Sequence, residues 1–544
     1  MKKAKSFVDK LLEPMLFLLF TAFAWIIMWG TFRSSPGTLE IGSRVWSDFA
    51  ATFPLIRSFS LGNNFPPEYP IFAGPPIRYH FLFFFLVGNL EKLGIPIDWA
   101  LNSLSILSFA LLLLFIYLTG KAVFKSRFVG LLSVLLFLFN SSWGFVEFFR
   151  KNPISGNLIN QITQNSTFTS FGPYDGKVVS AFWSLNIYTN QRHLAFAYAS
   201  FLGILYFIYR WSKIPTSFSY TKAILLGIFI GIFPFIHLAV FGMMGIALIT
   251  IIFLQPKLRK KMILAGSIAG AFAVGQILYM GSSSLETKLF NPGYLVRPLT
   301  LARFTSYWFY NLGITLLLAP IGFLLANKDQ RKFLIPFIVL FFVGNIFQLS
   351  AEIAANHKFF NLFTIGANFF TALLLIKLWK KHLFGKLMFI PLLLSLTLTG
   401  IIDFFPVIND SFIPLKDIPG NKTAEFIVLN TPKNATFLNA SFLYDPANIA
   451  GRKIYLGWPY FSWSAGYDTT KRHEVMKELL SSSSKTYICK TLSEENIDYI
   501  EIQKPTHLEE VEINYDYFSK NFTQIFFNSS DNITIYNVKS SCDF

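Results

Sequence analysis

The residue with the strongest claim to chemistry is Asp48, which lies in a polar stretch between two apolar segments. This stretch, residues 45–80, reads VWSDFAATFPLIRSFSLGNNFPPEYPIFAGPPIRYH. A carboxylate just past the outer end of a membrane span can serve as a general base, because partial desolvation raises its basicity. An ordinary solvated aspartate is the alternative, and the Pro- and Gly-rich sequence around Asp48 favours the chemical role. Glu68 is the second acid of the stretch, with a water-facing turn residue as its alternative.

Basic residues at the ends of apolar segments form the second group of candidates. Lysine and arginine side chains that converge on a phosphate stabilise it as a leaving group. Lys358 lies in AEIAANHKFFN (351–361), a short segment predicted to be exterior, where a cation needs an anionic partner such as a lipid phosphate. Arg303, at the next outer boundary, could bind the same phosphate.

Further candidates for substrate binding each have a structural alternative. Arg192 and His193 in YTNQRH begin a predicted span, where interfacial anchoring is the alternative. His237 in GIFPFIH could instead be a core histidine that binds carbonyl groups freed by the preceding proline. Arg452 has Gly- and aromatic-rich surroundings, which suit a sugar-binding loop and a structural corner equally. The remaining candidates, at the end of the polar stretch, are Arg78 and His80.

Several catalytic signatures are missing from the sequence. It contains no P-loop, no GxGxxG after a strand, no GxSxG elbow and no HExxH motif. These absences argue against ATP-driven transport, Rossmann cofactors, serine hydrolysis and zinc proteolysis. No Cys/His cluster has zinc spacing either. The sequence therefore names no metal ligand and no certain cofactor, and leaves a requirement for a divalent cation open.

The composition is that of a membrane protein. Of the 544 residues, 53% are hydrophobic and only 14% are charged, whereas about a quarter are charged in soluble domains. Apolar runs of roughly 18 or more residues recur before the tail, which predicts a polytopic α-helical membrane protein. The net charge of +17 lies mostly in short Lys/Arg clusters beside these runs, as the positive-inside rule produces. Nucleic acid is therefore not an expected partner, whereas the lipid bilayer is.

The predicted topology has about eleven spans, a cytoplasmic N-terminus and an exterior C-terminus. Residues 79–94 are too short and too interrupted to span, so we expect an interfacial helix there, and every basic cluster then lies on one side. This gives a transmembrane domain over 1–404, with a first exterior loop at 33–96, and an exterior domain over 405–544. The expected spans are 14–32, 97–120, 128–147, 190–209, 221–236, 238–255, 262–281, 305–326, 333–350, 362–377 and 387–404.

The tail from about residue 405 is more polar and contains short β-favouring runs, namely AEFIVL, TFLNASF, KIYLGW, YIEI and TIYNV. One helical pattern over about 470–482 interrupts them, which predicts a small α/β domain. The two cysteines, Cys489 and Cys542, both lie in this part. A disulfide and two free thiols are equally consistent with the sequence.

The layout resembles that of the GT-C superfamily of polyprenyl-phosphate-dependent glycosyltransferases, and in particular a poorly characterised group of large bacterial membrane proteins. The resemblance is carried by the acid of the first loop and by the segments PPIRYHFLFFFLVG, YTNQRH, GIFPFIH, NHKFF and GWPYFSWSAG. It implies that Asp48 orients or deprotonates the acceptor, and that Lys358 and Arg303 bind the lipid phosphate. The loop lacks the adjacent pair of acids of the best-characterised members, which puts a two-carboxylate or metal-bridged mechanism in doubt.

These observations lead to the hypothesis of a glycosyltransferase in the cell membrane. It would move a sugar from a polyprenyl-phosphate donor to a glycan, lipid or protein acceptor on the outer face, with inversion at the sugar carbon. One alternative is a transporter or flippase of a lipid-linked precursor, and another is a catalytically silent scaffold of the same fold. Transporters tend to have paired broken spans and ionisable residues at mid-bilayer, and the sequence indicates few of either.

Overall fold

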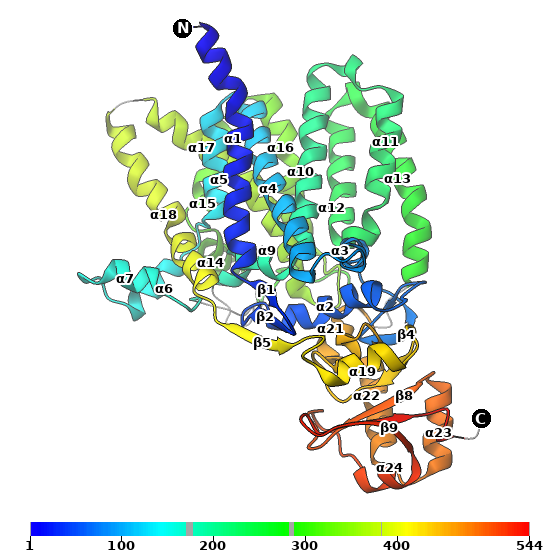
Figure 1. The fold of residues 1–544 in the computed structure, drawn as a ribbon. Helices are drawn as coiled ribbons and strands as arrows, with labels where there is room; N and C mark the ends of the chain where they lie inside the picture. Colours follow the sequence, from blue (N-terminus) through cyan, green and yellow to red (C-terminus); the bar gives the residue numbers. More distant parts are fainter. Residues whose placement is uncertain (1, 170–177, 282–287, 382, 543–544) are drawn as a thin grey trace. The chain divides into compact units, whose positions relative to one another are not determined.

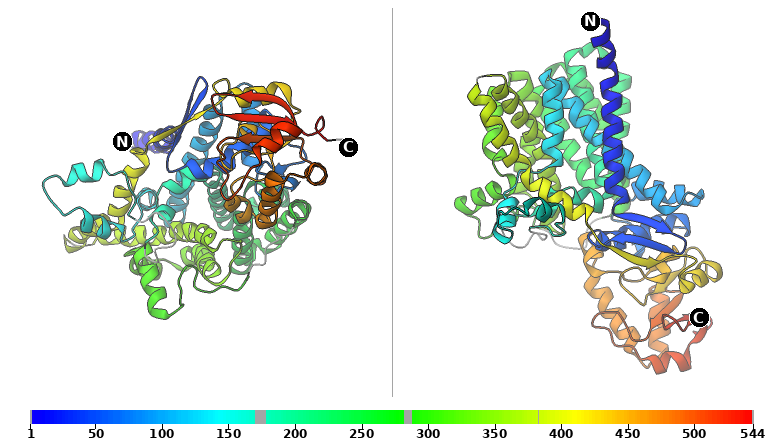
Figure 2. Two further views of the ribbon diagram at one scale, coloured as in Figure 1. Left: turned by 90° about the horizontal axis from the view of Figure 1, so that it is seen from below. Right: turned by 60° about the vertical axis from the view of Figure 1, so that its left-hand side comes forward.

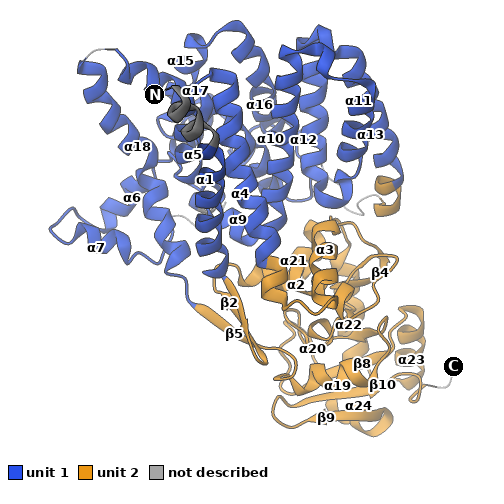
Figure 3. Cartoon of the chain, turned by 45° about the horizontal axis from the view of Figure 1, so that its top comes forward, with its two compact units in different colours: residues 1–31, 102–275, 288–411 blue, residues 32–101, 276–287, 412–544 orange. Residues whose placement is uncertain are grey.

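The computed structural model describes residues 2–169, 178–281, 288–381 and 383–542. The chain divides into two compact units (Figure 3). Unit 1 comprises residues 1–31, 102–275 and 288–411, and unit 2 comprises residues 32–101, 276–287 and 412–544. The predicted division at residue 404 follows the order of the sequence, whereas the contacts group the first polar stretch with the tail.

Unit 1 is a bundle of long apolar helices that lie side by side (Figure 1). Each helix follows an apolar run of the sequence, and polar or Pro-containing turns separate neighbouring helices. The long helices are α1 (Lys2–Trp29), α4 (Ile97–Phe124), α5 (Arg127–Leu138), α10 (Arg192–Lys213), α11 (Tyr220–Gly231), α12 (Phe233–Leu254), α13 (Arg259–Met280), α14 (Leu301–Leu312), α15 (Thr315–Leu325), α16 (Lys328–Ile346), α17 (His357–Trp379) and α18 (Leu383–Ile408).

Seven helical segments in the described part of the chain are long and apolar enough to cross a membrane. The pair α14 and α15 makes an eighth candidate if its two helices, which are bent by 84°, count as one broken span. The shorter helices α5 and α11 and the helix α16, whose start is charged, coincide with three more of the predicted spans. A multi-pass helical architecture is therefore present, and the number of eleven spans stays a prediction.

The segment that follows α5 contains four short helices, α6 (Gly144–Lys151), α7 (Leu158–Thr163), α8 (Ser180–Trp183) and α9 (Asn186–Asn190). The amide of Asn409, after α18, donates to the carbonyl oxygen of Thr163 at 2.8 Å, which ties α7 to the end of the bundle. Residues 170–177 of the predicted exterior loop lie outside the described residues.

Unit 2 begins with a sheet built from distant parts of the sequence. Strands β1 (Phe32–Ser35) and β2 (Thr38–Gly42) form a hairpin, and β2 pairs antiparallel with β5 (Phe412–Lys416). The helices α2 (Trp46–Ser60) and α3 (Leu82–Lys92) and a second hairpin, β3 (Glu68–Tyr69) and β4 (Phe72–Pro76), follow. A helix is thus present within the predicted interfacial segment 79–94, and its position at a membrane surface stays a prediction.

A mixed five-stranded sheet, drawn in orange to red in Figure 2, forms the rest of unit 2. Its order is β7 (Lys453–Ile454), β6 (Thr436–Leu438), β8 (Tyr499–Gln503), β10 (Ile533–Asn537) and β9 (Thr523–Asn528). Strand β6 is parallel to β7 and β8, and β10 is antiparallel to both of its neighbours. The helices are α19 (Lys422–Asn430), α20 (Pro446–Ile449), α21 (Pro459–Ser464), α22 (Thr469–Ser481), α23 (Lys485–Glu494) and α24 (Tyr515–Asn521).

Four of the five β-favouring runs of the tail contain strands, and the helix predicted over 470–482 is α22. The run AEFIVL was wrongly expected to be a strand, because it lies in α19. The Asn421 side chain accepts from the Ala424 N–H at 2.9 Å and caps this helix, and local capping outweighs the β propensity of the run. A disulfide joins Cys489 of α23 to Cys542.

Candidate functional site

Asp48 lies in the first turn of α2 rather than in an irregular loop. Its side chain is half-buried, and its carbonyl oxygen accepts a hydrogen bond from the Thr52 hydroxyl at 3.1 Å. A negative charge in the first turn of a helix interacts favourably with the helix dipole. The residues that follow, from Phe49 onward, bury the other face of α2 in unit 2. The Asp48 carboxylate is therefore held at the N-terminal end of α2 by the packing of that helix.

The negative charge of Asp48 acts on three tyrosine side chains of unit 2. Burial, followed by the charge of Asp48, raises the pKa of Tyr79 and of Tyr444. Burial is also the largest cause that raises the pKa of Tyr69, and the charge of Asp48 adds to it. The three phenols therefore stay protonated at neutral pH, and each is a neutral hydrogen-bond donor near a single acidic residue.

The start of α2 is fixed by Tyr444. Its hydroxyl donates to the carbonyl oxygen of Trp46 at 2.6 Å, and the two rings lie 4.3 Å apart between centroids. Tyr444 was not among the residues that the sequence singled out, because nearly 400 positions separate it from Trp46. The only local sign of a defined structure at Tyr444 is that Asp445 and Pro446 follow it, a cap and first residue typical of a helix start.

The other candidates of the first polar stretch hold unit 2 together. Glu68 accepts from the Gly74 N–H at 2.7 Å and pairs with Lys453 at 2.8 Å. Arg78 donates from its backbone N–H to the Tyr467 hydroxyl at 2.8 Å, and its guanidinium lies over the Tyr467 ring. These contacts give Glu68 and Arg78 a structural role.

His80 stacks on the neighbouring ring of Tyr79, with 3.9 Å between the ring centroids. Tyr79 in turn stacks on Tyr69 at 5.7 Å. The imidazole of His80 is thus stacked at one end of a row of rings that continues through Tyr79 to Tyr69.

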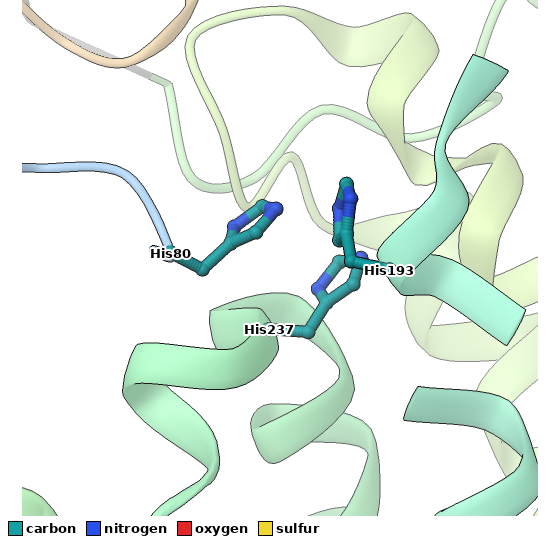
Figure 4. Close-up of side chains that lie close together, drawn as sticks. All are labelled: His80, His193 and His237. Atoms are coloured by element: carbon teal, nitrogen blue, oxygen red, sulfur yellow. The ribbon is translucent and has the colours of Figure 1, made fainter. Parts of the chain in front are cut away.

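Unit 1 brings together two of the histidines that the sequence predicted separately. His193 is the second residue of α10 and His237 lies in α12, and their ring centroids are 5.2 Å apart (Figure 4). Both side chains are buried, with 1% exposure each. His237 has extended rather than helical backbone angles, so α12 is broken at this residue, one turn after Pro234. Two imidazoles at such a distance are ligands that a zinc ion accepts, although a zinc site needs at least three protein ligands.

Lys358 belongs to the same part of unit 1. It lies in the first turn of α17, and the Tyr198 hydroxyl of α10 donates to its carbonyl oxygen at 2.8 Å. Its positive charge is close enough to act on both His193 and His237. The ends of α10, α12 and α17 therefore hold a cation beside two imidazoles.

Arg192 is fully buried where α10 begins, at 1% exposure. Its guanidinium donates to the carbonyl oxygen of Thr189 at 2.8 Å, the amide oxygen of Asn102 at 3.1 Å and the hydroxyl of Thr31 at 2.8 Å. Thr31 follows α1, Asn102 belongs to α4 and Thr189 belongs to α9, so Arg192 joins the start of α10 to three other parts of the bundle.

Two predicted phosphate or substrate ligands are engaged elsewhere. Arg303, in the first turn of α14, is exposed and donates to the carbonyl oxygen of Arg297 at 3.0 Å. None of the hydrogen bonds and ion pairs of Arg303 in the described part of unit 1 involves Lys358. Arg452 is buried in unit 2, where its guanidinium donates to five backbone carbonyl oxygens and to the Thr431 hydroxyl.

Sequence reasoning missed a polar region inside the bundle. A cavity of about 40 Å³ lies between α5, α9, α15 and α17, and many of its lining residues carry amide or hydroxyl groups. Asp403 of α18 is also buried, and the amide of Asn140, which lines the cavity, donates to its carboxyl oxygen at 3.4 Å. The signal that could have found it is an acid within an apolar run, TLTGIIDFF. The lining polar residues are Asn140, Ser141, Ser184, Tyr188, Asn311, Thr315, Asn361, Thr364 and Asn368.

No protein-family model matches the chain, and no curated protein does. Three solved structures similar to it are of archaeal oligosaccharyltransferases from Archaeoglobus fulgidus. One is tethered to an acceptor peptide that contains the NVT sequon. It matches at 12% sequence identity and a TM-score of 0.47, and the match covers 98% of this chain and 75% of the other.

The second is AglB in complex with an inhibitory peptide and a dolichol-phosphate, at 12% identity and a TM-score of 0.42, with 99% of this chain and 75% of the other covered. The third is a complex with zinc and sulfate, at 13% sequence identity and a TM-score of 0.45. The match covers 96% of this chain and 73% of the other.

Proposed function

We propose that this chain is an integral membrane glycosyltransferase that moves a sugar from a polyprenyl-phosphate donor to an acceptor on the outer face of the membrane. The observation that carries the proposal is the position of Asp48. It is a half-buried carboxylate in the first turn of α2, its charge acts on three protonated phenols, and the same turn contains no second acid. A single positioned carboxylate of this kind suits proton abstraction from an acceptor hydroxyl.

The reaction follows from the charges that each group can take. Asp48 accepts the proton of the acceptor hydroxyl as the acceptor oxygen forms a bond to the anomeric carbon of the sugar. The bond from that carbon to the phosphate oxygen breaks, and the lipid phosphate leaves with the electron pair. In this proposal Lys358 supplies the positive charge that a phosphate leaving group needs. Asp48 then releases its proton to water.

The disulfide supports an exterior location for the tail. Disulfides persist in oxidising compartments and are rare in the cytosol, and Cys489 and Cys542 form one in unit 2. Asp48 belongs to the same unit as this disulfide. A transfer reaction on the outer face, with a cytoplasmic N-terminus and an exterior tail in the cell membrane, is consistent with that location.

The test is sugar transfer by purified protein in lipid vesicles, supplied with a panel of polyprenyl-phosphate sugars. We expect transfer by the unmodified protein and a loss of about 100- to 10,000-fold in Asp48→Asn, the range for removal of a general base. Asp516→Asn is the matched control, because Asp516 is an exposed aspartate that also lies in the first turn of a helix, α24. Unchanged turnover in Asp48→Asn would show that another group is the base.

A transporter of lipid-linked precursors is the second candidate, and the broken span of α14 and α15 favours it. Discontinuous helices beside buried polar residues are typical of transporter binding sites. The 84° bend between these helices and the polar cavity next to α15 are features of this kind. Movement of a labelled lipid-linked sugar across the vesicle membrane, without transfer, would favour transport over catalysis. A protein that does neither with intact donors would be a scaffold.

A further inference from the structure

The carboxyl group of Asp403 is buried in unit 1 and is only half satisfied. Asp403 belongs to α18, one of the helices apolar enough to cross a membrane, and it is 1% exposed. One carboxyl oxygen, Oδ2, accepts from the amide of Asn140 at 3.4 Å, whereas Oδ1 has no hydrogen-bond partner among the described residues. A buried acid in an apolar helix is costly unless something neutralises it, so Asp403 indicates a positively charged ligand.

Asn140 connects this carboxyl group to the polar cavity of the bundle. It lines the cavity of about 40 Å³ between α5, α9, α15 and α17, and its amide is the group that donates to Asp403. None of the described residues that line the cavity is charged. The polar ones are asparagines, serines, threonines and a tyrosine, and each of them offers a neutral oxygen atom. Asp403 is thus one hydrogen bond away from a cavity lined by neutral oxygen ligands.

Two side chains of the lining lack hydrogen-bond partners. Asn368, in the middle of α17, is 7% exposed, and its side-chain amide forms no hydrogen bond with a described residue. The same holds for the hydroxyl of Tyr188 in α9, a residue that is 4% exposed. Buried polar groups are nearly always satisfied by protein, water or a ligand. A cavity of this volume has room for roughly three water-sized groups, so a small polar occupant fits it.

The chemistry of the lining narrows the class of occupant. Oxygen atoms without sulfur or imidazole ligands suit hard cations rather than transition metals. Calcium and magnesium sites are usually built from carboxylates that contact the ion, and the described lining contains none. A single carboxylate one residue further away balances one positive charge. The set therefore fits a monovalent ion.

We propose that the cavity between α5, α9, α15 and α17 binds an alkali-metal cation, with the lining oxygens as ligands and Asp403 as the counter-charge behind Asn140. One ion then accounts for both observations, the half-satisfied buried acid and the side chains of Asn368 and Tyr188 that lack partners. A carboxylate that accepts from a ligand residue holds and polarises that residue, as it does behind other metal sites. Ion binding goes beyond the proposed function, because it requires neither a sugar donor nor an acceptor.

An ion in this cavity stabilises unit 1 by mass action, which unfolding of the full-length protein in detergent measures. The salts to compare at equal ionic strength are sodium chloride, potassium chloride and choline chloride, whose organic cation is too large for the cavity. We expect the unfolding midpoint to rise with sodium or potassium chloride and to reach a plateau, which screening of surface charge does not produce. A midpoint that depends on ionic strength alone would overturn the proposal.

Asp403→Asn removes the counter-charge and keeps the shape of the side chain. We expect the concentration of sodium or potassium chloride at half-saturation to increase by about 10- to 100-fold, as loss of a unit charge several ångströms away predicts. Asp329→Asn is the matched control, because Asp329 is an exposed acid of α16 in the same unit. Its response to the salts should equal that of the unmodified protein. An unchanged response in Asp403→Asn would exclude Asp403 as the counter-charge.

Asn368→Leu separates an ion ligand from a structural residue, and it remains a test if Asp403→Asn fails to fold. The substitution removes no hydrogen bond between described residues, so the variant should be as stable as the unmodified protein, or more stable, in choline chloride. In sodium or potassium chloride we expect the gain in stability to be reduced, with half-saturation about tenfold higher. A full gain in Asn368→Leu would show that the ion is bound elsewhere, which overturns the proposal.

A proton on Asp403 is the competing way to neutralise the acid. The unfolding midpoint would then change with pH and show no difference among the three chlorides, which would also overturn the proposal. Sugar transfer is measured separately. Its absence would refute the proposed function and leave the salt data to decide whether the cavity binds an ion.

Discussion

A buried charge can be a structural element of its own, and Arg452 is an example. Its guanidinium hydrogens are directed at the carbonyl oxygens of Leu61, Ile427, Val428, Thr431 and Ala450. These carbonyls belong to the end of α2, to the end of α19 and to the turn after α20. Arg452 therefore donates hydrogen bonds to backbone carbonyl oxygens that would otherwise lack partners where three helices end. Its Gly-rich surroundings leave room for this arrangement.

We predict that Arg452→Met destabilises unit 2 by about 3 kcal/mol or more, because several buried carbonyl groups lose their donors at once. The measurement is the midpoint of thermal or denaturant unfolding, followed by circular dichroism in detergent. Arg472→Met is a useful comparison, since Arg472 donates to only two carbonyl oxygens and is held partly by the Phe72 ring. An Arg452→Met protein as stable as the unmodified one would contradict the prediction.

At the scale of elements, α2 is attached to its neighbours through Arg57. This side chain pairs with Glu91 of α3 at 3.2 Å and with Asp417, just after β5, at 2.6 Å, and all three side chains are largely buried. The Ser60 hydroxyl also donates to Glu91 at 2.5 Å. The orientation of the helix that carries Asp48 thus depends on one cation between two carboxylates.

Arg57→Ala should cost about 3 to 5 kcal/mol of stability at neutral pH, because it leaves two buried carboxyl groups without their counter-charge. Burial already raises the pKa of Glu91, and Arg57 is the main group that lowers it. Without Arg57 this pKa rises further, so the stability of the variant should recover as the pH is lowered and Glu91 becomes neutral. Unfolding midpoints between pH 4 and pH 8 measure this. A deficit that does not change with pH would show that packing rather than charge is lost.

The break between α14 and α15 depends on Gly313. Its φ of +55° is in the region that favours glycine, and a Cβ atom at this position would lie 1.7 Å from the carbonyl oxygen of Ser141. The Ser141 hydroxyl also donates to the carbonyl oxygen of Leu312 and accepts from Thr315, which fixes both sides of the break.

Gly313→Ala should therefore destabilise the bundle by about 2 to 6 kcal/mol, the sum of backbone strain and overpacking. The apparent melting temperature and the yield of monodisperse protein in detergent report this loss. In Gly270→Ala the added Cβ meets nothing within 4 Å in the middle of α13, so this control should be neutral or slightly stabilised. Equal behaviour of the two variants would refute the role of Gly313.

At the scale of the whole molecule, the disulfide gives a test of topology. It closes a segment of 53 residues, and loss of such a cross-link costs about 4 kcal/mol in the chain-entropy model. We predict that a reducing agent lowers the unfolding midpoint of unit 2, and that the unmodified and Cys489→Ser/Cys542→Ser proteins then unfold alike. In intact cells, a membrane-impermeant maleimide should label these cysteines only after reduction. Labelling that requires lysis would place the tail on the cytoplasmic side.

The sequence predicted those features of the molecule that depend on local pattern. Apolar runs located most of the long helices, although the span predicted over 128–147 ends at Leu138 and the one over 305–326 is two helices, and the clustering of basic residues allowed a topology to be drawn. His193, His237 and Lys358 were each singled out for their own surroundings, and the structure adds that they lie together. Contacts over long separations could not be predicted, because no local pattern records them. Examples are the contact of Tyr444 with Trp46 and the ion pair of Arg57 with Asp417.

Because β2 pairs with β5, the sheet of unit 2 can be completed only late in synthesis of the chain. Residues 32–101 leave the ribosome long before residues 412–544, which supply strand β5 and the Tyr444 hydroxyl that donates to Trp46 of α2. At roughly 5 to 20 residues per second, the roughly 300 intervening residues take about 15 to 60 s to synthesise. During this interval the β1–β2 hairpin has an unpaired edge. A nascent chain halted after α18 should therefore be an early substrate for chaperones and proteases of the cell envelope.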